Sequence, residues 1–309
     1  MSDQRSLSPR AWSELLLLSL IWGASFLSIR VALDEIGVAT TVAHRVGWAA
    51  LILWAVVAFR RLPLPRDPRI WGAFLVMGVL NNVIPFSLMA WGQLHIETGL
   101  TSILNAATAI FGVLVAALVF ADERLTLRRM IGVSLGFLGV ATAIGLDALA
   151  GFDLRSLAQL AVLGGTLSYA FAGAWARRML GGLRPEVAAV GTLTGSAVVM
   201  IPAAWMIDGP ITLDLRPRTM LAIAYYAAIA TALAYLLYYR VLAMAGVGNL
   251  LLCTLLIPPV AIVLGVLVRG EALHPGAYLG FALLAIGLLI LNGHPRRRIR
   301  PLPNSRRAG

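Results

Sequence analysis

The sequence predicts an all-α integral membrane protein with ten transmembrane helices, arranged as two inverted five-helix repeats. Three observations carry this prediction: an apolar composition, ten long apolar stretches, and a motif that recurs 148 residues further along the chain.

Of the 309 residues, 60% are hydrophobic and only 13% are charged, and the mean hydropathy is +0.86. A soluble domain carries about 25% charged residues, so most of this apolar surface must face lipid. The net charge of +11 comes from arginines dispersed between apolar stretches, which argues against a nucleic-acid partner. The lone Cys253 excludes an intrachain disulfide framework. The long first apolar segment lacks a small-residue cleavage pattern, so we expect an uncleaved helix.

A helix needs roughly 20 apolar residues to cross the hydrocarbon core of a bilayer. Charge clusters and Gly/Pro breaks divide the chain into ten such stretches, and the connections between them are short. Neighbouring helices are therefore expected to be antiparallel. The stretches are approximately 12–33, 39–59, 70–93, 98–121, 127–146, 156–179, 186–207, 218–240, 247–268 and 275–293.

The arginines orient these helices. If the N-terminus is cytoplasmic, 19 of the 25 arginines lie on the cytoplasmic side and four on the other, with Arg30 and Arg45 inside spans. Positively charged loops stay in the cytoplasm. Both termini are therefore predicted to be cytoplasmic, and the number of spans is predicted to be even.

A repeat of five helices divides the chain into residues 12–146 and 156–293, followed by a basic cytoplasmic tail, 294–309. Because five is odd, the second copy enters the membrane from the opposite side. Inverted repeats are typical of secondary transporters, whose substrate site lies between the repeats near the midplane. The repeated residues are Glu123, Leu125, Gly132 and Gly139, which recur as Glu271, Leu273, Gly280 and Gly287, and Trp22 and Arg30, which align with Tyr169 and Arg177.

The run Ile21 to Phe26 with Arg30, the His44-Arg45 pair and the two Glu-x-Leu-x6-Gly motifs resemble the EamA-type branch of the drug/metabolite transporter superfamily. The resemblance covers about residues 12–293 and is greatest to the YddG-type amino-acid exporters of bacteria. Family members carry a proline in helices 4 and 9. Pro258 matches it, whereas helix 4 departs from the pattern with Ile110.

This resemblance implies export of small metabolites, in particular amino acids including aromatic or other neutral ones, by alternating access across the bacterial inner membrane. The expected partners are the lipid bilayer and a small-molecule substrate. No cofactor and no metal are expected, and the protein is expected to be monomeric. A different small drug or metabolite on the same fold is the alternative substrate.

Polar and aromatic side chains inside the apolar stretches are the candidate site residues. They predict a midplane cavity bounded by helices 3, 4, 8 and 9; the alternative is hydrogen bonding between packed helices. The predicted substrate-binding residues are Trp22, Asn82, Thr101, Asn105, Tyr169, Thr231, Tyr235 and Cys253, and the predicted gating or vestibule residues are His44, Arg45, Pro85 and Pro258.

Three interpretations of Arg45, roughly six residues into helix 2, remain open. It could reach the outer headgroups, pair with Asp34 or Glu35, or meet a substrate carboxylate. His44 points elsewhere on the helix, either toward the outer vestibule or into a helix interface.

All 14 carboxylates lie near span ends or in loops. Buried ionisable groups usually mark proton or cation sites, so we expect an apolar, neutral or zwitterionic substrate and transport without obligatory proton movement. Glu123 and Glu271 are expected to cap the helices that follow them. The glycines of helices 5 and 10 predict close packing at the periphery of the protein.

An intramembrane enzyme is the rival from another class. It would need a catalytic constellation, such as a Ser/His pair, two aspartates or a zinc-binding motif. Only His44 of the four histidines lies clearly within a span, and the sequence has neither an HExxH motif nor a P-loop.

Overall fold

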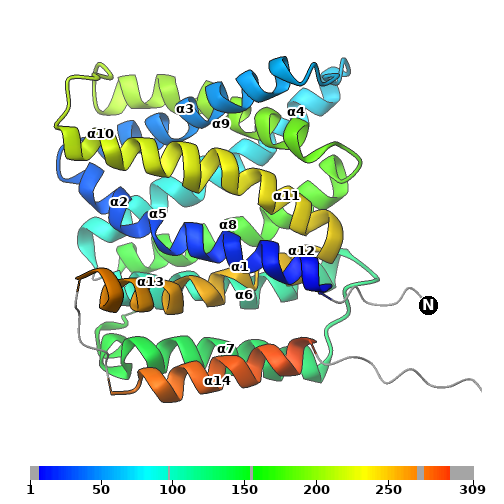
Figure 1. Cartoon of the computed structure of the whole chain (residues 1–309), viewed down its shortest axis with the longest axis vertical. Coiled ribbons are helices and arrows are strands. Elements are labelled where there is room, and N and C mark those ends of the chain that lie inside the picture. Colours follow the sequence, from blue (N-terminus) through cyan, green and yellow to red (C-terminus); the bar gives the residue numbers. More distant parts are fainter. Residues whose placement is uncertain (1–6, 97, 154–155, 270–274, 293–309) are drawn as a thin grey trace, which may run out of the picture.

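The computed structural model describes residues 7–96, 98–153, 156–269 and 275–292. Within these ranges all regular secondary structure is helical, and none of the described residues forms a β-strand (Figure 1). The predicted tail 294–309 and Glu271 lie outside the described residues.

The first repeat follows the predicted order of five spans. The first span is broken at Ala24 and the third contains a π-helical segment, η1. Its helices are α1 (Pro9–Gly23), α2 (Ser25–Leu33), α3 (Val38–Phe59), α4 (Pro68–Gly78), η1 (Val79–Val83), α5 (Ile84–His95), α6 (Thr98–Val119) and α7 (Leu127–Ile144).

The second repeat has the same plan, with π-helical segments in its first and third spans. A short 3-10 helix, η2 (Leu146–Gly151), precedes it. Its helices are α8 (Leu157–Trp175), η3 (Ala176–Leu180), α9 (Pro185–Ile207), α10 (Pro217–Ala224), η4 (Tyr225–Leu233), α11 (Ala234–Ala245), α12 (Val247–Leu250), α13 (Cys253–Arg269) and α14 (Ala277–Asn292).

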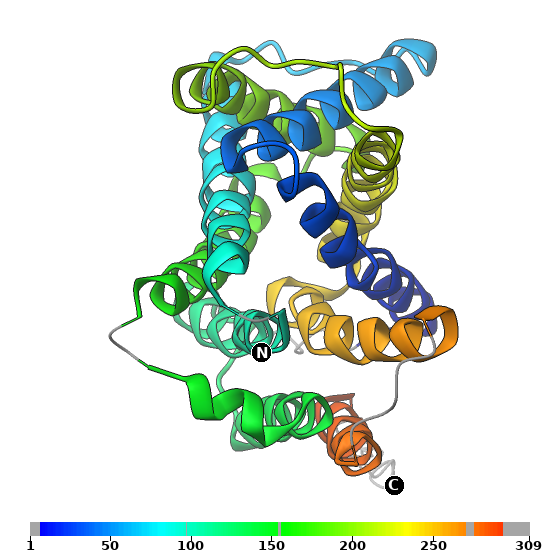
Figure 2. The ribbon, with the colours of Figure 1, turned by 90° about the vertical axis from the view of Figure 1, so that its left-hand side faces the viewer.

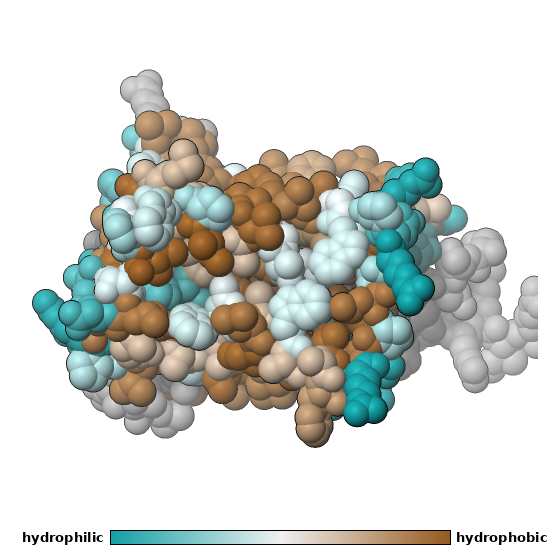
Figure 3. All heavy atoms as spheres, turned by 90° about the horizontal axis from the view of Figure 1, so that it is seen from above, coloured by the Kyte–Doolittle hydropathy of each residue, from teal (hydrophilic) through white to brown (hydrophobic). Residues whose placement is uncertain are grey.

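Eight of these helical stretches are long and apolar enough to cross a membrane, and the described parts of the other two, Val247–Val260 and Ala277–Leu291, are shorter apolar helices. Large apolar side chains are exposed on their outer faces, including Leu51, Leu118 and Val198 at 60, 86 and 64% exposure. Figure 3 shows apolar side chains across the middle of one face and hydrophilic ones at its two ends. This arrangement matches a bilayer between two aqueous phases.

Proline and polar caps fix where many helices begin. Pro9, Pro68, Pro185 and Pro217 occupy the first turns of their helices, where the missing N–H costs no hydrogen bond. Thr126 accepts a hydrogen bond from the Arg129 N–H at 3.2 Å at the start of α7.

Packing joins the two repeats along most of their length. The largest contacts include α3 with α9, α6 with α8 and α7 with α14, and each pairs a helix of the first repeat with one of the second. In Figure 2 the other helices surround a common centre, while α7 and α14 lie apart as a pair. These two helices are the fifth and tenth spans, so the prediction that spans 5 and 10 are peripheral agrees with this arrangement.

The glycines of the sequence motif explain how closely α7 and α14 pack. A Cβ atom on Gly139 would lie 2.6 Å from the carbonyl oxygen of Gly280, and one on Gly287 would lie 2.6 Å from that of Gly132. The motif glycines of one repeat therefore contact those of the other directly through the backbone: Gly139 meets Gly280, and Gly132 meets Gly287.

The fourth and ninth spans, which differ in sequence at the proline position, also differ in the continuity of their helices. The fourth span, α6, is continuous through Ile110, whereas the ninth is broken at Leu251 and Leu252 into α12 and α13. Pro258 lies inside α13, after this break.

Ion pairs connect ends that the arginine distribution assigns to the same side. Arg240 of α11 binds Glu14 of α1, and Arg60 lies 3.1 Å from Glu186. At the opposite end Glu35 accepts a hydrogen bond from the Arg216 N–H at 3.0 Å. The relative sidedness of these loops is thus as predicted.

Candidate functional site

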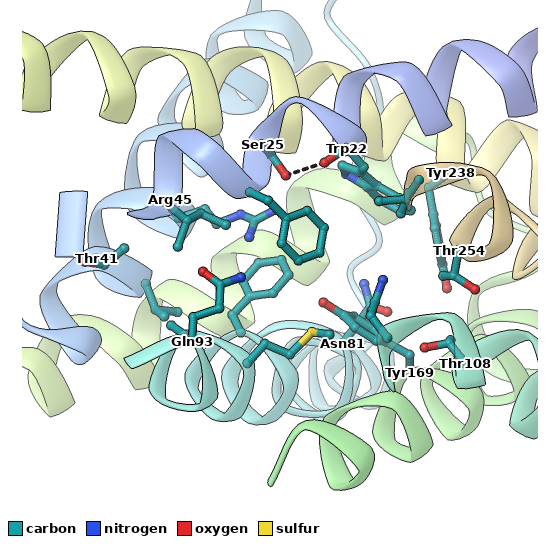
Figure 4. Close-up of a pocket in the computed structure, with 18 of the residues that line it drawn as sticks. Trp22, Ser25, Thr41, Arg45, Asn81, Gln93, Thr108, Tyr169, Tyr238 and Thr254 are labelled. Carbon is teal, nitrogen blue, oxygen red and sulfur yellow. Dashed lines mark hydrogen bonds between the residues drawn. The ribbon is translucent and has the colours of Figure 1, made fainter. Parts of the chain in front are cut away.

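A cavity lies between the two repeats and encloses about 860 Å³ of space not filled by protein atoms, including the part open to solvent. Figure 4 shows polar side chains converging on it from several helices. Its wall draws on α1, α2, α3, η1, α5 and α6 of the first repeat and on α8, α11, α13 and the turn before α13 in the second. The first, second and sixth spans (α1 and α2, α3, and α8) therefore line the cavity in addition to the four spans predicted to bound it.

The π-helical segment η1 supplies two buried amides. Asn81 Nδ2 donates to the Tyr235 hydroxyl at 2.7 Å, and that hydroxyl donates to Asn82 Oδ1. Asn82 Nδ2 donates in turn to Ser196 Oγ at 2.6 Å. Asn81 and Tyr235 line the cavity, whereas Asn82 lies outside its wall and bonds Tyr235.

Equivalent π-helical segments occur in both repeats. A shift of 148 residues carries residues 79–83 of η1 onto 227–231, inside η4. A π-helical turn is wider than an α-helical one and often marks a functional site. Each segment packs against helices of the opposite repeat, η1 against α8 and α9, and η4 against α1, α2 and α3.

Each π-helical segment is bonded by the first helix of the opposite repeat. Trp22 Nε1 of α1 donates to the Ala230 carbonyl at 2.9 Å, and Ser168 Oγ of α8 donates to the Leu80 carbonyl at 2.6 Å. Both π-helical segments are therefore supported by hydrogen bonds that cross between the repeats.

Aromatic rings form much of the remaining wall. Trp22 and Tyr238 lie 6.4 Å apart between ring centroids, and Tyr235 stacks on Tyr238 at 5.9 Å. Tyr169 contacts Phe86 edge-on at 6.5 Å. The predicted pair Trp22 and Tyr169 therefore lines the cavity, one ring from each repeat.

Arg45 turns into the cavity and is only 7% exposed. Its Nε donates to Thr231 Oγ1 at 2.9 Å, and its guanidinium carbon lies 3.7 Å from the centroid of the Phe86 ring. It neither reaches the outer surface nor pairs with Asp34 or Glu35. Two of the three interpretations open from the sequence are thereby excluded in this structure.

The polar face of α6 meets the cavity in part. Asn105 and Thr108 line it, while Thr101 is buried but does not form part of the wall. Gly112, one turn further, packs against Leu251, since a Cβ there would lie 2.5 Å from a leucine methyl carbon.

Other predicted residues lie behind the wall. Thr231 holds Arg45 and donates to the Tyr226 carbonyl at 2.7 Å. Cys253 is fully buried, and its carbonyl accepts a hydrogen bond from Ser19. Pro85 packs against Gly165 of α8, and Pro258 is buried within α13. Their roles in binding or gating stay predictions.

His44 lies next to Arg45 but faces a different hollow. Its Nδ1 accepts a hydrogen bond from Trp48 Nε1 at 3.2 Å. This second hollow, between α3 and α9, is larger, about 1390 Å³ including open solvent, but its wall is mostly apolar and it opens along the flank of the protein. We assign it to the lipid-facing surface, because polar groups do not converge there.

Several cavity residues escaped the sequence analysis. Gln93, Thr41 and Ser25 line the wall and are buried, and Phe86 stacks on Arg45. Gln93 lies near a helix end, where a glutamine is unremarkable, and a phenylalanine in an apolar stretch resembles a lipid-facing residue. The signal that could have found Phe86 is its position directly after Pro85 in the polar part of helix 3.

A buried cluster closes the predicted cytoplasmic end. Glu123 accepts hydrogen bonds from the N–H groups of Val247 and Gly248 at 2.9 and 3.0 Å, and from Arg177 at 2.7 Å. Arg129 lies 3.5 Å from the same carboxylate. Glu123 therefore caps α12 of the other repeat. The expectation that it caps the helix following it was wrong, because Thr126 occupies that position.

The predicted outer end is held by a more exposed carboxylate. Glu35 accepts hydrogen bonds from the Thr219 hydroxyl and the Arg216 N–H. The hydrogen bond from Thr219, with that of Arg216 and the charges of Arg216 and Arg218, lowers the pKa of Glu35 against the opposing effect of burial. Asp208 bonds the Thr40 N–H at 2.7 Å nearby.

The chain resembles known membrane proteins over almost its whole length. It is 29% identical over 307 residues to a probable terminal-alkyne amino-acid exporter of Streptantibioticus cattleyicolor, with 97% of this chain and 99% of that protein covered. It is 25% identical to a probable amino-acid metabolite efflux pump of Escherichia coli, covering 89% and 92%. One crystal structure superposes with a TM-score of 0.75 at 16% identity, covering 91% of this chain and 96% of the other.

The two inverted repeats around a common cavity define a multi-pass membrane protein with the architecture of a secondary transporter. The model of the EamA-like transporter family matches residues 12–145 and 156–293. The chain belongs to the EamA-like transporter family, a family of the drug/metabolite transporter superfamily.

Proposed function

We propose that this protein exports small metabolites, amino acids among them, from the cytoplasm across the bacterial inner membrane. The observation that carries this proposal is the cavity between the repeats, where aromatic rings and neutral amides surround one arginine. The relatives named as amino-acid exporters support the same substrate class. Both termini are taken to be cytoplasmic and the protein to act as a monomer.

The route proposed is alternating access, in which one end of the cavity opens while the other closes. Arg177 and Arg30 are equivalent in the two repeats, yet their contacts differ. Arg177 pairs with Asp122 and Glu123 in the cluster at the predicted cytoplasmic end. Arg30 is half exposed and donates to the Gln93 carbonyl at 3.1 Å. This asymmetry supports a state closed toward the cytoplasm.

Counterflow in proteoliposomes tests the function. Purified protein is reconstituted with a panel of unlabelled amino acids inside and the labelled compound outside, and uptake is measured against empty liposomes. Asn105→Leu fills the cavity wall with an apolar side chain and is expected to reduce exchange at least tenfold. Leu138→Ala, on the exposed face of α7, is the matched control and should exchange as the wild type does.

Exchange of none of the amino acids would contradict the assignment. If small drugs or other metabolites exchange instead, with the same sensitivity to Asn105→Leu, the transporter on this fold has another substrate class. Equal exchange by wild type and Asn105→Leu would show that the substrate does not pass through this cavity.

A further inference from the structure

Arg45 carries a buried charge whose hydrogen-bonding capacity is largely unused. A guanidinium has five N–H donors, and the structure gives Arg45 one hydrogen bond, from Nε to Thr231. Among the described residues no carboxylate oxygen lies within 4 Å of it. The ionisable groups that interact electrostatically with its guanidinium are three tyrosines, Tyr169, Tyr235 and Tyr226. Its two Nη atoms thus face the cavity without an anionic partner.

The position of this side chain is fixed. The Thr231 hydroxyl gives its own proton to the Tyr226 carbonyl, so an oxygen lone pair is left to accept from Arg45 Nε. The Phe86 ring covers one face of the guanidinium. These two contacts hold Arg45 away from the headgroups and aim the outer edge of the guanidinium into the cavity, where Figure 4 shows it.

A buried arginine without a counter-ion is costly at membrane depth, and such residues pair with a charge or mark a substrate path. The cavity wall contains no aspartate or glutamate among the described residues. Its other polar groups, such as Asn81, Gln93 and Asn105, are neutral. The cavity wall therefore has a formal charge of +1, which repels cationic ligands and attracts one anionic group.

We propose that the cavity binds compounds that carry a carboxylate, and that Arg45 is the residue that binds this carboxylate. The inference rests on the proposed function and names its substrate class. A guanidinium fork matches a carboxylate with two parallel hydrogen bonds. The apolar body of the ligand lies toward the other end of the cavity, where Trp22 and Tyr238 form an aromatic wall.

Ligand series that differ only in the head group test this assignment. Binding is measured by thermal shift of the detergent-purified protein at millimolar ligand. Three bodies are used, butyl, phenylethyl and indolylethyl, each as the α-amino acid, the simple carboxylic acid, the amino-acid amide and the primary amine. We expect the acids and the amino acids to bind at least tenfold more tightly than the matching amides and amines, because charge-assisted hydrogen bonds are lost in the latter.

Variants locate the recognition at Arg45. Arg45→Gln should weaken binding of the carboxylates about 10- to 100-fold and should not weaken binding of the amides, so the preference for carboxylates disappears. Arg45→Lys keeps the charge without the fork and should bind at an intermediate level. Thr231→Val removes the hydrogen bond that positions Arg45 and should weaken carboxylate binding less than Arg45→Gln does. Arg178→Gln, which removes an exposed arginine outside the cavity, should bind as the wild type does.

Equal binding of acids, amides and amines by the wild type overturns the proposal, and so does the absence of any carboxylate-dependent shift across the three bodies. If Arg45→Gln does not fold, the wild-type series and Arg45→Lys decide the question. A phenylethyl phosphonate that binds tenfold more tightly than the acid would assign the site to phosphoryl compounds instead. Carboxylate binding without any exchange in proteoliposomes would reject the proposed function and leave this inference intact.

Discussion

Gly139 and Gly280 lie backbone to backbone at the contact between α7 and α14, since a Cβ on either residue would lie within 2.6 Å of the other's carbonyl oxygen. In the repeat Gly280 is the equivalent of Gly132, and Gly287 is the equivalent of Gly139, and Gly132 meets Gly287 in the same way. The contact therefore joins the repeats through their own symmetry, with no side chain between them.

Enlarging one of these glycines should separate the two helices. Gly139→Val is expected to lower the melting temperature of the detergent-purified protein by several degrees, because overpacking costs about 1–3 kcal/mol. Gly72→Ala is the matched control, as a Cβ there meets nothing within 4 Å, and alanine is the better helix former. If Gly139→Val is as stable as Gly72→Ala, α7 and α14 accommodate the larger side chain without loss of stability, and the prediction is wrong.

Neutralising Glu123 should loosen the predicted cytoplasmic end. Glu123→Gln removes the carboxylate that Arg129 and Arg177 contact, and removing one member of a buried pair costs about 3–5 kcal/mol. We expect a clear loss of thermal stability and, in a Cys253→Ser background, faster reaction of Ala245→Cys with water-soluble thiol reagents, since Ala245 is buried at the end of α11. Glu186→Gln breaks the more exposed pair with Arg60 and should change stability by less than about 1 kcal/mol. An unaltered reaction rate in Glu123→Gln would exclude a closing role.

The contacts of Glu35 predict a pH dependence at the outer end. Because its pKa is lowered in the folded protein, chiefly by the Thr219 hydroxyl, its stabilising contribution is present above the unfolded pKa. It is lost as the pH falls through the folded pKa. Thr219→Val should therefore lower the melting temperature at pH 7 and narrow the difference between pH 7 and pH 3.5. A pH profile parallel to that of the wild type would contradict this role.

The distribution of arginines predicts the orientation of the whole chain. Reporter fusions after the C-terminal tail and in the loop at Gly209 and Pro210 should report opposite sides, cytoplasmic and external respectively. Moving the C-terminal fusion to the loop at residues 181–184 should report the cytoplasmic side again. Reports from the tail and the Gly209 loop that agree with each other would require another number of spans.

The helices and their order were predictable because a chain must satisfy its backbone hydrogen bonds inside lipid. The breaks within spans were not, because each depends on a partner far along the chain. The carbonyls of Leu80 and Ala230 in the π-helical segments accept from Ser168 and Trp22 of the opposite repeat. The periodicity of apolar residues within one segment does not predict such contacts between distant segments.

The site was predictable only in part, for a similar reason. Asn105 and Tyr235 stood out as polar groups in apolar stretches, and both line the cavity. His44 and Arg45 are neighbours, and the sequence alone could not show which faces inward. The direction of Arg45 is decided by Thr231 and Phe86, residues of two other spans.

The uncompensated charge of Arg45 also bears on what powers transport. A simple carboxylate neutralises the site on binding and leaves the cell as one negative charge. A membrane potential that is negative inside does work on that charge, about 2.3 kcal/mol per 100 mV, which corresponds to roughly a 50-fold concentration ratio. Such export would be electrogenic and would need no buried proton acceptor. A zwitterion crossing by the same route carries no net charge and would move only down its own concentration gradient.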